Sequence, residues 1–121
     1  MTKIVRVGNS VLYRGDCREV LPQIEAADAL ITDAPYELRT HALLAKSRIM
    51  KRTGGHQKRS LSFIHIDDEM RKFLCAEAVR VSSGWFLVFC SVEGVTPWVD
   101  AVEAAGARYK RTCVWTKPDP T

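Results

Sequence analysis

Residues 28–36 read Asp28-Ala29-Leu30-Ile31-Thr32-Asp33-Ala34-Pro35-Tyr36. Leu30 and Ile31 form the centre of a short buried strand, and Asp33 begins the turn that ends it. Pro35 fixes its own φ and pushes the preceding Ala34 toward an extended conformation. The pattern predicts a stiff platform at the carboxyl end of a strand, which is where ligands bind in an open α/β sheet.

This platform offers one acidic side chain, two backbone carbonyls and one aromatic ring. The carboxylate of Asp33 can accept one N–H, the carbonyl of Ala34 can accept another, and Tyr36 can stack on a ring. Such a set suits a flat polar ring that bears an amino group. The alternative is an ordinary strand-to-loop turn, which these residues by themselves suit equally well.

The sequence Asp33-Ala34-Pro35-Tyr36 resembles the signature of the amino-group DNA methyltransferases, which is Asp, Asn or Ser followed by Pro-Pro and an aromatic residue. These enzymes methylate adenine or cytosine with S-adenosylmethionine as cofactor. The resemblance implies that Asp33, Ala34, Pro35 and Tyr36 are the catalytic residues and that double-stranded DNA is the partner. The chain departs from the family at Ala34, where proline is usual and a backbone carbonyl is used. A family of glutamine-modifying protein methyltransferases has the related Asn-Pro-Pro-Tyr, whose first residue differs from Asp33.

The chain has 121 residues, of which 46% are hydrophobic and 26% are charged, with a formal net charge of +4. These values are typical of one soluble globular domain, and the mild basic bias permits a polyanionic partner. No apolar run approaches the ~20 residues that span a bilayer. The composition therefore predicts a cytoplasmic protein without a membrane segment.

The four cysteines are too far apart for a disulfide framework or a zinc site, and the three histidines show no metal-ligand spacing. We therefore expect no metal. Three of the cysteines lie in hydrophobic patterns and are expected in the core: Cys75, Cys90 and Cys113.

The chain before this platform predicts a hairpin and a capped helix. Gly8-Asn9 separates two β-branched runs between residues 3 and 14, which is a hairpin signal. Asp16 is expected to cap a helix with Glu19 completing a capping box, and Pro22 should shorten or kink that helix. By the resemblance, Asp16 and Cys17 lie beside the adenosine part of the cofactor. Asp16 can therefore serve as a helix cap, as part of the cofactor site, or as both.

A basic segment, predicted to be a mobile loop over residues 37–62, follows the platform. Seven of the chain's 18 basic residues lie between residues 39 and 59, and no acid occurs between Glu37 and Asp67. Such a segment suits contacts to DNA phosphates, with binding that weakens steeply with salt. The alternative is a solvated charged loop. The candidate DNA-binding residues are Arg39, Lys46, Arg48, Lys51, Arg52, Lys58 and Arg59.

The second half of the chain alternates helices with strands. Asp67 or Asp68 is expected to cap a helix that Gly84 ends, and the apolar run 85–90 predicts a central strand covered on both faces. A helix from about Val95 to Gly106 and a final strand 109–115 follow. Phe63, Trp98 and Trp115 are expected in the core. The order predicts a layered α/β fold with right-handed crossovers.

The resemblance extends over nearly the whole chain and includes Val114-Trp115-Thr116-Lys117, which matches a family strand ending in Val-Trp-x-Lys. It implies a partial Rossmann-like methyltransferase sheet with flanking helices and an N-terminal β-hairpin. The family's methyl-donor loop contains Gly-x-Gly, which this sequence lacks. We therefore expect residues 1–121 to be one truncated catalytic domain, the catalytic half of a longer enzyme.

The expected function is methyl transfer from S-adenosylmethionine to the amino group of a flipped base in DNA. Adenine is favoured over cytosine because the motif begins with aspartate, a preference that comes from the resemblance. The alternative is a catalytically inactive nucleic-acid-binding module. A glutamine-modifying protein methyltransferase is disfavoured by Asp33 and by the basic segment.

Overall fold

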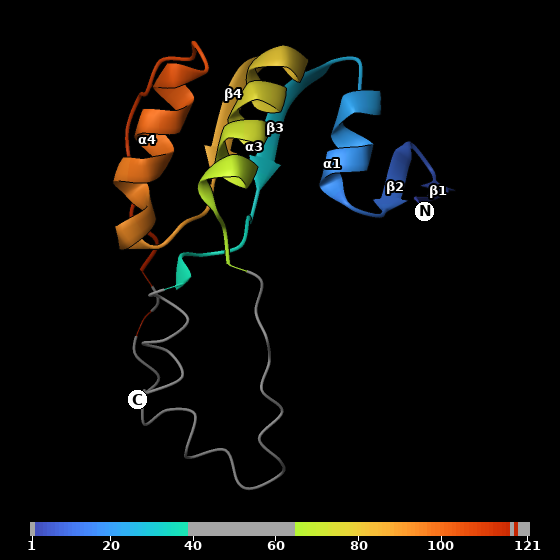
Figure 1. Ribbon diagram of the computed structural model, residues 1–121. Helices are drawn as coiled ribbons and strands as arrows, with labels where there is room; N and C mark the ends of the chain where they lie inside the picture. Colours follow the sequence, from blue (N-terminus) through green and yellow to red (C-terminus); the bar gives the residue numbers. More distant parts are fainter. Residues whose placement is uncertain (1, 39–64, 117, 119–121) are drawn as a thin grey trace, which may run out of the picture.

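The computed structural model describes residues 2–38, 65–116 and 118. It is a mixed α/β structure with two small sheets (Figure 1). The elements follow the order β1 (Lys3–Val7), β2 (Ser10–Arg14), α1 (Cys17–Val20), η1 (Leu21–Gln23), β3 (Ala27–Thr32), α3 (Asp68–Val81), β4 (Ser82–Val88), η3 (Val92–Gly94) and α4 (Val95–Ala104).

The N-terminal hairpin forms as the sequence predicted. Strands β1 and β2 pair antiparallel, with Val7 opposite Ser10, so that Gly8 and Asn9 make a two-residue turn. Gly8 has a φ of 57°, the left-handed region that such turns require. The hairpin lies to one side of the β3–β4 sheet (Figure 1), and nearly all of its residues are exposed.

Strands β3 and β4 form a parallel pair, and α3 lies in the described part of the crossover between them. Ile31 lies opposite Leu87, and the pairing continues past β4 through a 2.9 Å hydrogen bond from the amide of Phe89 to the carbonyl of Thr32. This β3–α3–β4 unit is an α/β arrangement. It places the turn after Thr32 at the carboxyl end of the sheet.

The prediction that Gly84 ends the preceding helix was wrong, because α3 stops at Val81 and Gly84 lies inside β4. The glycine has another reason to be there. A Cβ at this position would lie 2.6 Å from the carbonyl oxygen of Asp28 on β3. Gly84 therefore permits a close approach of two backbones, a requirement that glycine meets inside strands.

The buried core lies on one face of the β3–β4 pair. It contains Leu74 and Cys75 of α3, Trp98 of α4, and two residues of the connecting segments, Ala34 and Ile66. The half-buried residues packed against this core come from α1, η1, α3, β4, α4 and the segments that follow β4 and α4: Cys17, Leu21, Met70, Phe73, Phe86, Val88, Cys90, Ala101, Val102 and Ala105. The three α-helices of the described residues therefore all contribute to one cluster.

The prediction that the apolar run 85–90 is covered on both faces was wrong. Side chains alternate along a strand, and only Phe86, Val88 and Cys90 face the core. Trp85 and Leu87 remain 59% and 47% exposed. On β3, Ile31 is 64% exposed and Leu30 is half-buried, so the prediction of a buried strand centred on these two residues was also wrong. Within the described residues, one face of the parallel pair is therefore open.

The prediction of a final strand at 109–115 was also wrong, since the structure assigns no strand to these residues. Trp115 is 76% exposed and meets Phe89 edge-on, at a ring-centroid distance of 6.5 Å. Trp115 and the exposed Cys113 are thus outside the core, contrary to expectation, whereas Trp98 and Cys75 are buried as predicted. Phe63 lies outside the described residues.

Candidate functional site

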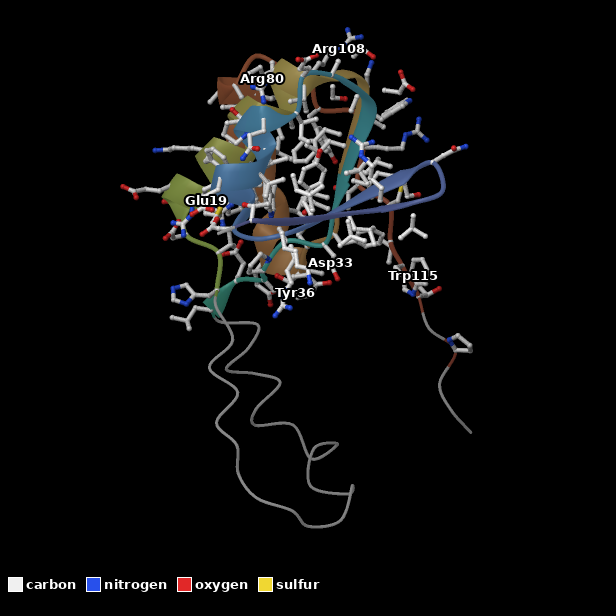
Figure 2. The ribbon with its side chains drawn as sticks, turned by 90° about the vertical axis from the view of Figure 1, so that its right-hand side faces the viewer. Glu19, Asp33, Tyr36, Arg80, Arg108 and Trp115 are labelled. Carbon is white, nitrogen blue, oxygen red and sulfur yellow. The ribbon has the colours of Figure 1, made fainter. Side chains whose placement is uncertain are left out.

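The turn Asp33–Tyr36 lies directly after the last residue of β3. Asp33 is exposed, Tyr36 is half-buried, and Ala34 between them is 5% exposed within the core cluster. Figure 2 shows the labelled side chains of Asp33 and Tyr36 near each other at one end of the molecule, with Arg80 at the other end. The buried methyl of Ala34 anchors the turn, and its two functional side chains remain accessible.

The Tyr36 phenol lies close enough to Asp33 for the charge of the carboxylate and a side-chain hydrogen bond to shift the pKa of the tyrosine. Partial burial of the phenol, followed by the negative charge of Asp33 and this hydrogen bond, raises the pKa of Tyr36 above its ordinary value. A carboxylate has two oxygens with about four acceptor positions, so this hydrogen bond leaves room for further donors. The structure thus brings together the acid and the ring that the sequence assigned to one platform.

The segment after Tyr36 is fixed by two contacts. The carbonyl of Tyr36 accepts a 3.2 Å hydrogen bond from the amide of Ile66. The carboxylate of Glu37 accepts a 2.7 Å hydrogen bond from the guanidinium of Arg71, whose residue is 3% exposed. These contacts join the turn to α3 and to the residues that lead into it.

Sequence reasoning missed Arg71, although a signal was present. Positions 71, 74, 75 and 78 of α3 form one helical stripe, and the other three members are buried apolar residues. A charged residue in such a stripe indicates a buried partner of opposite charge, because an unpaired buried charge is costly. Glu37, immediately after the motif, is that partner.

Asp16 caps α1 as predicted. Its carboxylate accepts a 2.9 Å hydrogen bond from the amide of Arg18 and also bonds the guanidinium of the same residue. The side-chain and backbone hydrogen bonds from Arg18 lower the pKa of Asp16 to about 2. The carboxylate is thus already engaged. Pro22 follows within η1, so the expected shortening of the helix is confirmed.

Cys17 is half-buried and packs against the core cluster, and burial raises the pKa of its thiol. Glu19, labelled in Figure 2, accepts a 3.4 Å hydrogen bond from the hydroxyl of Thr2. These contacts give Cys17 a packing role and tie α1 to the start of the hairpin.

Seven candidate residues for DNA binding lie outside the described residues: Arg39, Lys46, Arg48, Lys51, Arg52, Lys58 and Arg59. Among the residues that the structure does describe, no group of three or more His, Cys, Asp or Glu side chains could hold a metal ion. No helix in the same part of the chain is long and apolar enough to cross a membrane.

Comparisons with protein-family models, with curated proteins and with solved structures found no match to this chain. The chemistry proposed for this site therefore comes from the turn itself. An accessible carboxylate beside an aromatic ring can accept hydrogen bonds from a planar group and stack on its face. An acceptor-only carboxylate favours a ligand that presents N–H donors.

Proposed function

We propose that this chain supplies the base-binding side of an amino-group DNA methyltransferase. The observation that carries this proposal is the turn after β3, where the exposed Asp33 lies beside the half-exposed ring of Tyr36 in a sequence that resembles the family's motif. The parallel β3–α3–β4 unit supports it, because a Rossmann-like sheet is built from such units. A cytoplasmic location belongs to the same proposal.

In this proposal the target base is flipped out of the duplex, at a cost of a few kcal/mol. Stacking on Tyr36 offsets about 1–3 kcal/mol of that cost. Asp33 and the carbonyl of Ala34 accept the two hydrogens of the exocyclic amine, so that the nitrogen lone pair is directed away from the ring. The chain thereby positions the amine for transfer. Adenine is favoured over cytosine on the family's pattern alone.

The described residues do not by themselves fit the cofactor. S-adenosylmethionine supplies the methyl group in such enzymes, and its nucleoside needs a close-approach glycine turn. Among the described glycines, positive φ occurs at Gly8 in the hairpin and at Gly106 after α4, and neither follows β3 or β4. Asp16 is held by Arg18. The base side is therefore the part of the reaction that this chain's described residues support.

The basic residues between 39 and 59 are proposed to contact DNA phosphates. They follow the Asp33–Tyr36 turn directly in the sequence, so the same connection would carry both base and backbone contacts. Neutralising about five phosphates gives a slope of log K against log salt of about −4 to −5. If log K does not change with log salt, the proposed contacts to DNA phosphates are refuted.

The test is methyl transfer from methyl-labelled S-adenosylmethionine to mixed-sequence duplex DNA by the complete enzyme, in which the cofactor-binding half is supplied, for the wild type and for Asp33→Ala. Transfer should be lost in Asp33→Ala while DNA affinity, measured by fluorescence anisotropy, changes by less than about twofold. Asp28→Ala is the matched control, because Asp28 is an exposed acid at the other end of β3. Turnover that survives Asp33→Ala would refute the assignment.

A second candidate is a catalytically inactive nucleic-acid-binding module. The engaged carboxylate of Asp16 and the missing Gly-x-Gly favour it. A titration with labelled S-adenosylmethionine separates the two candidates. The inactive module binds DNA in a salt-dependent way but shows no cofactor affinity and no turnover, even when the cofactor-binding half is supplied.

A further inference from the structure

Arg71 is only 3% exposed and is the only buried charged residue among the described residues. One guanidinium nitrogen donates to Glu37 at 2.7 Å and another to Asp68 at 2.5 Å. The guanidinium also lies over the ring of Trp98, 5.6 Å from its centroid. The buried guanidinium of α3 therefore binds Glu37, the residue that follows Tyr36.

Burial of this charge is costly, and the contacts around it are incomplete. The Nε atom of Arg71 is buried without a hydrogen-bond partner. Asp68 is 84% exposed, so its ion pair contributes little, whereas the Glu37 side chain is only 20% exposed. Buried ion pairs often stabilise a protein no better than apolar residues of the same size. A role in holding one conformation explains the arrangement better than stability does.

The conformation held is that of the turn. Glu37 is the residue after Tyr36, and its carboxylate lies between Arg71 and the close packing at Gly94, where a Cβ would come within 3.2 Å of it. The carbonyl of Tyr36 is bound by Ile66. With both of these groups fixed, the backbone of Tyr36 has little freedom, and its ring stays beside Asp33.

We propose that Arg71 is a positioning residue that holds the Tyr36 ring against Asp33 by binding Glu37. The benefit of this positioning for base binding rests on the proposed function. The claim that Arg71 holds Tyr36 beside Asp33 does not. Without this anchor, the acid and the ring would no longer keep one relative orientation. A base would then have to order them as it binds, which weakens binding.

Helix α3 contains a matched control. Arg80 also forms an ion pair on this helix, with Glu77 at 2.6 Å, and it donates to the carbonyls of Leu21 and Ile24 at 2.8 and 3.0 Å. It therefore anchors the chain before β3, whereas Arg71 anchors the chain after β3. Figure 2 shows Arg80 at the opposite end of the molecule from Asp33 and Tyr36.

The test follows the ring of Tyr36 by NMR in ¹³C-tyrosine-labelled protein during a pH titration, with Tyr36→Phe to assign the signal. In Arg71→Met and in Glu37→Leu, the Tyr36 ring shift should move and its pKa should fall toward the ordinary value of 10.0. Arg71→Lys should restore part of the wild-type signal. Arg80→Met should lower the melting temperature and leave the Tyr36 titration unchanged.

An unchanged Tyr36 signal in folded Glu37→Leu, whose side chain cannot accept from Arg71 as glutamine still can, would overturn the proposal, even if Arg71→Met does not fold. An equal change in Arg80→Met would also overturn it, because the effect would then reflect general loosening. The experiment needs no nucleotide or cofactor. If the protein binds no base, the proposed function is refuted, but the expected change of the Tyr36 signal in the variants is unaffected.

Discussion

Replacing Arg71 with methionine leaves Glu37 partly buried without its partner. Breaking a buried ion pair costs about 3–5 kcal/mol, and the lower end applies because the Glu37 side chain remains 20% exposed. We expect a loss of about 3 kcal/mol in the free energy of unfolding. At roughly 4 °C per kcal/mol for a domain of this size, the melting temperature should fall by about 10 °C.

The assay is thermal and urea unfolding followed by circular dichroism, with a second variant that separates the ion pair from packing. Arg71→Met combined with Glu37→Leu removes both charges and should recover most of the lost stability, because an apolar pair often replaces a buried ion pair without loss. A cost below about 1 kcal/mol for Arg71→Met, as for an exposed pair, would refute the reasoning. So would a double variant whose cost is the sum of the two single costs.

Three further substitutions test the fold and the cap of α1. Gly84→Ala places a Cβ 2.6 Å from the carbonyl of Asp28 and should cost about 3 kcal/mol in urea unfolding. In Gly8→Ala the added Cβ meets open space, but φ is positive, so we expect a loss of about 1 kcal/mol in the free energy of unfolding. A larger loss for Gly8→Ala than for Gly84→Ala would contradict the β3–β4 register. Asp16→Asn should lower the melting temperature most above pH 4, because the folded-state pKa of Asp16 is about 2 and its ordinary value is 3.8. The stabilising contribution is present above pH 3.8 and is lost as pH falls toward 2. A difference between wild type and Asp16→Asn that stays constant over this range would contradict the assignment of Asp16 as a charged cap.

Local signals in the sequence predicted local structure well. The Gly8-Asn9 turn, the cap at Asp67 and the short first helix at Pro22 each depend on residues close together in the chain. The side chain of Asp67 accepts a 2.7 Å hydrogen bond from the amide of Met70, as an N-cap should. These features could be read without knowledge of the tertiary fold.

Features that depend on distant residues could not be read in this way. Gly84 looked like a helix stop because its contact with Asp28 of β3 is invisible in the sequence. The apolar run at Trp85 looked doubly covered because its composition does not show that the described α-helices all contribute to a core on one face. The segment 109–115 has a strand-like pattern, but a strand also needs a paired edge.

The candidate site follows the same division. Exposure of Asp33 and partial exposure of Tyr36 agree with the stiff turn that Pro35 predicts. The anchoring of that turn by Arg71 was not predicted, because it joins residues 34 positions apart. The roles of Asp33, Ala34, Pro35 and Tyr36 in catalysis stay predictions.

The most direct measurement compares binding of deoxyadenosine and deoxyinosine monophosphates to the protein, followed through the NMR signal of Tyr36. Inosine replaces the exocyclic amino group with a carbonyl and carries its remaining hydrogen on ring N1, so it offers no exocyclic N–H to the Asp33 carboxylate or the Ala34 carbonyl. A hydrogen bond to a charged group contributes about 1.5–3 kcal/mol, so adenine should bind about 10- to 100-fold more tightly. Asp33→Ala should remove this preference. Equal affinity for the two nucleotides, or a preference that survives Asp33→Ala, would contradict the claim that this turn recognises an amino-bearing base.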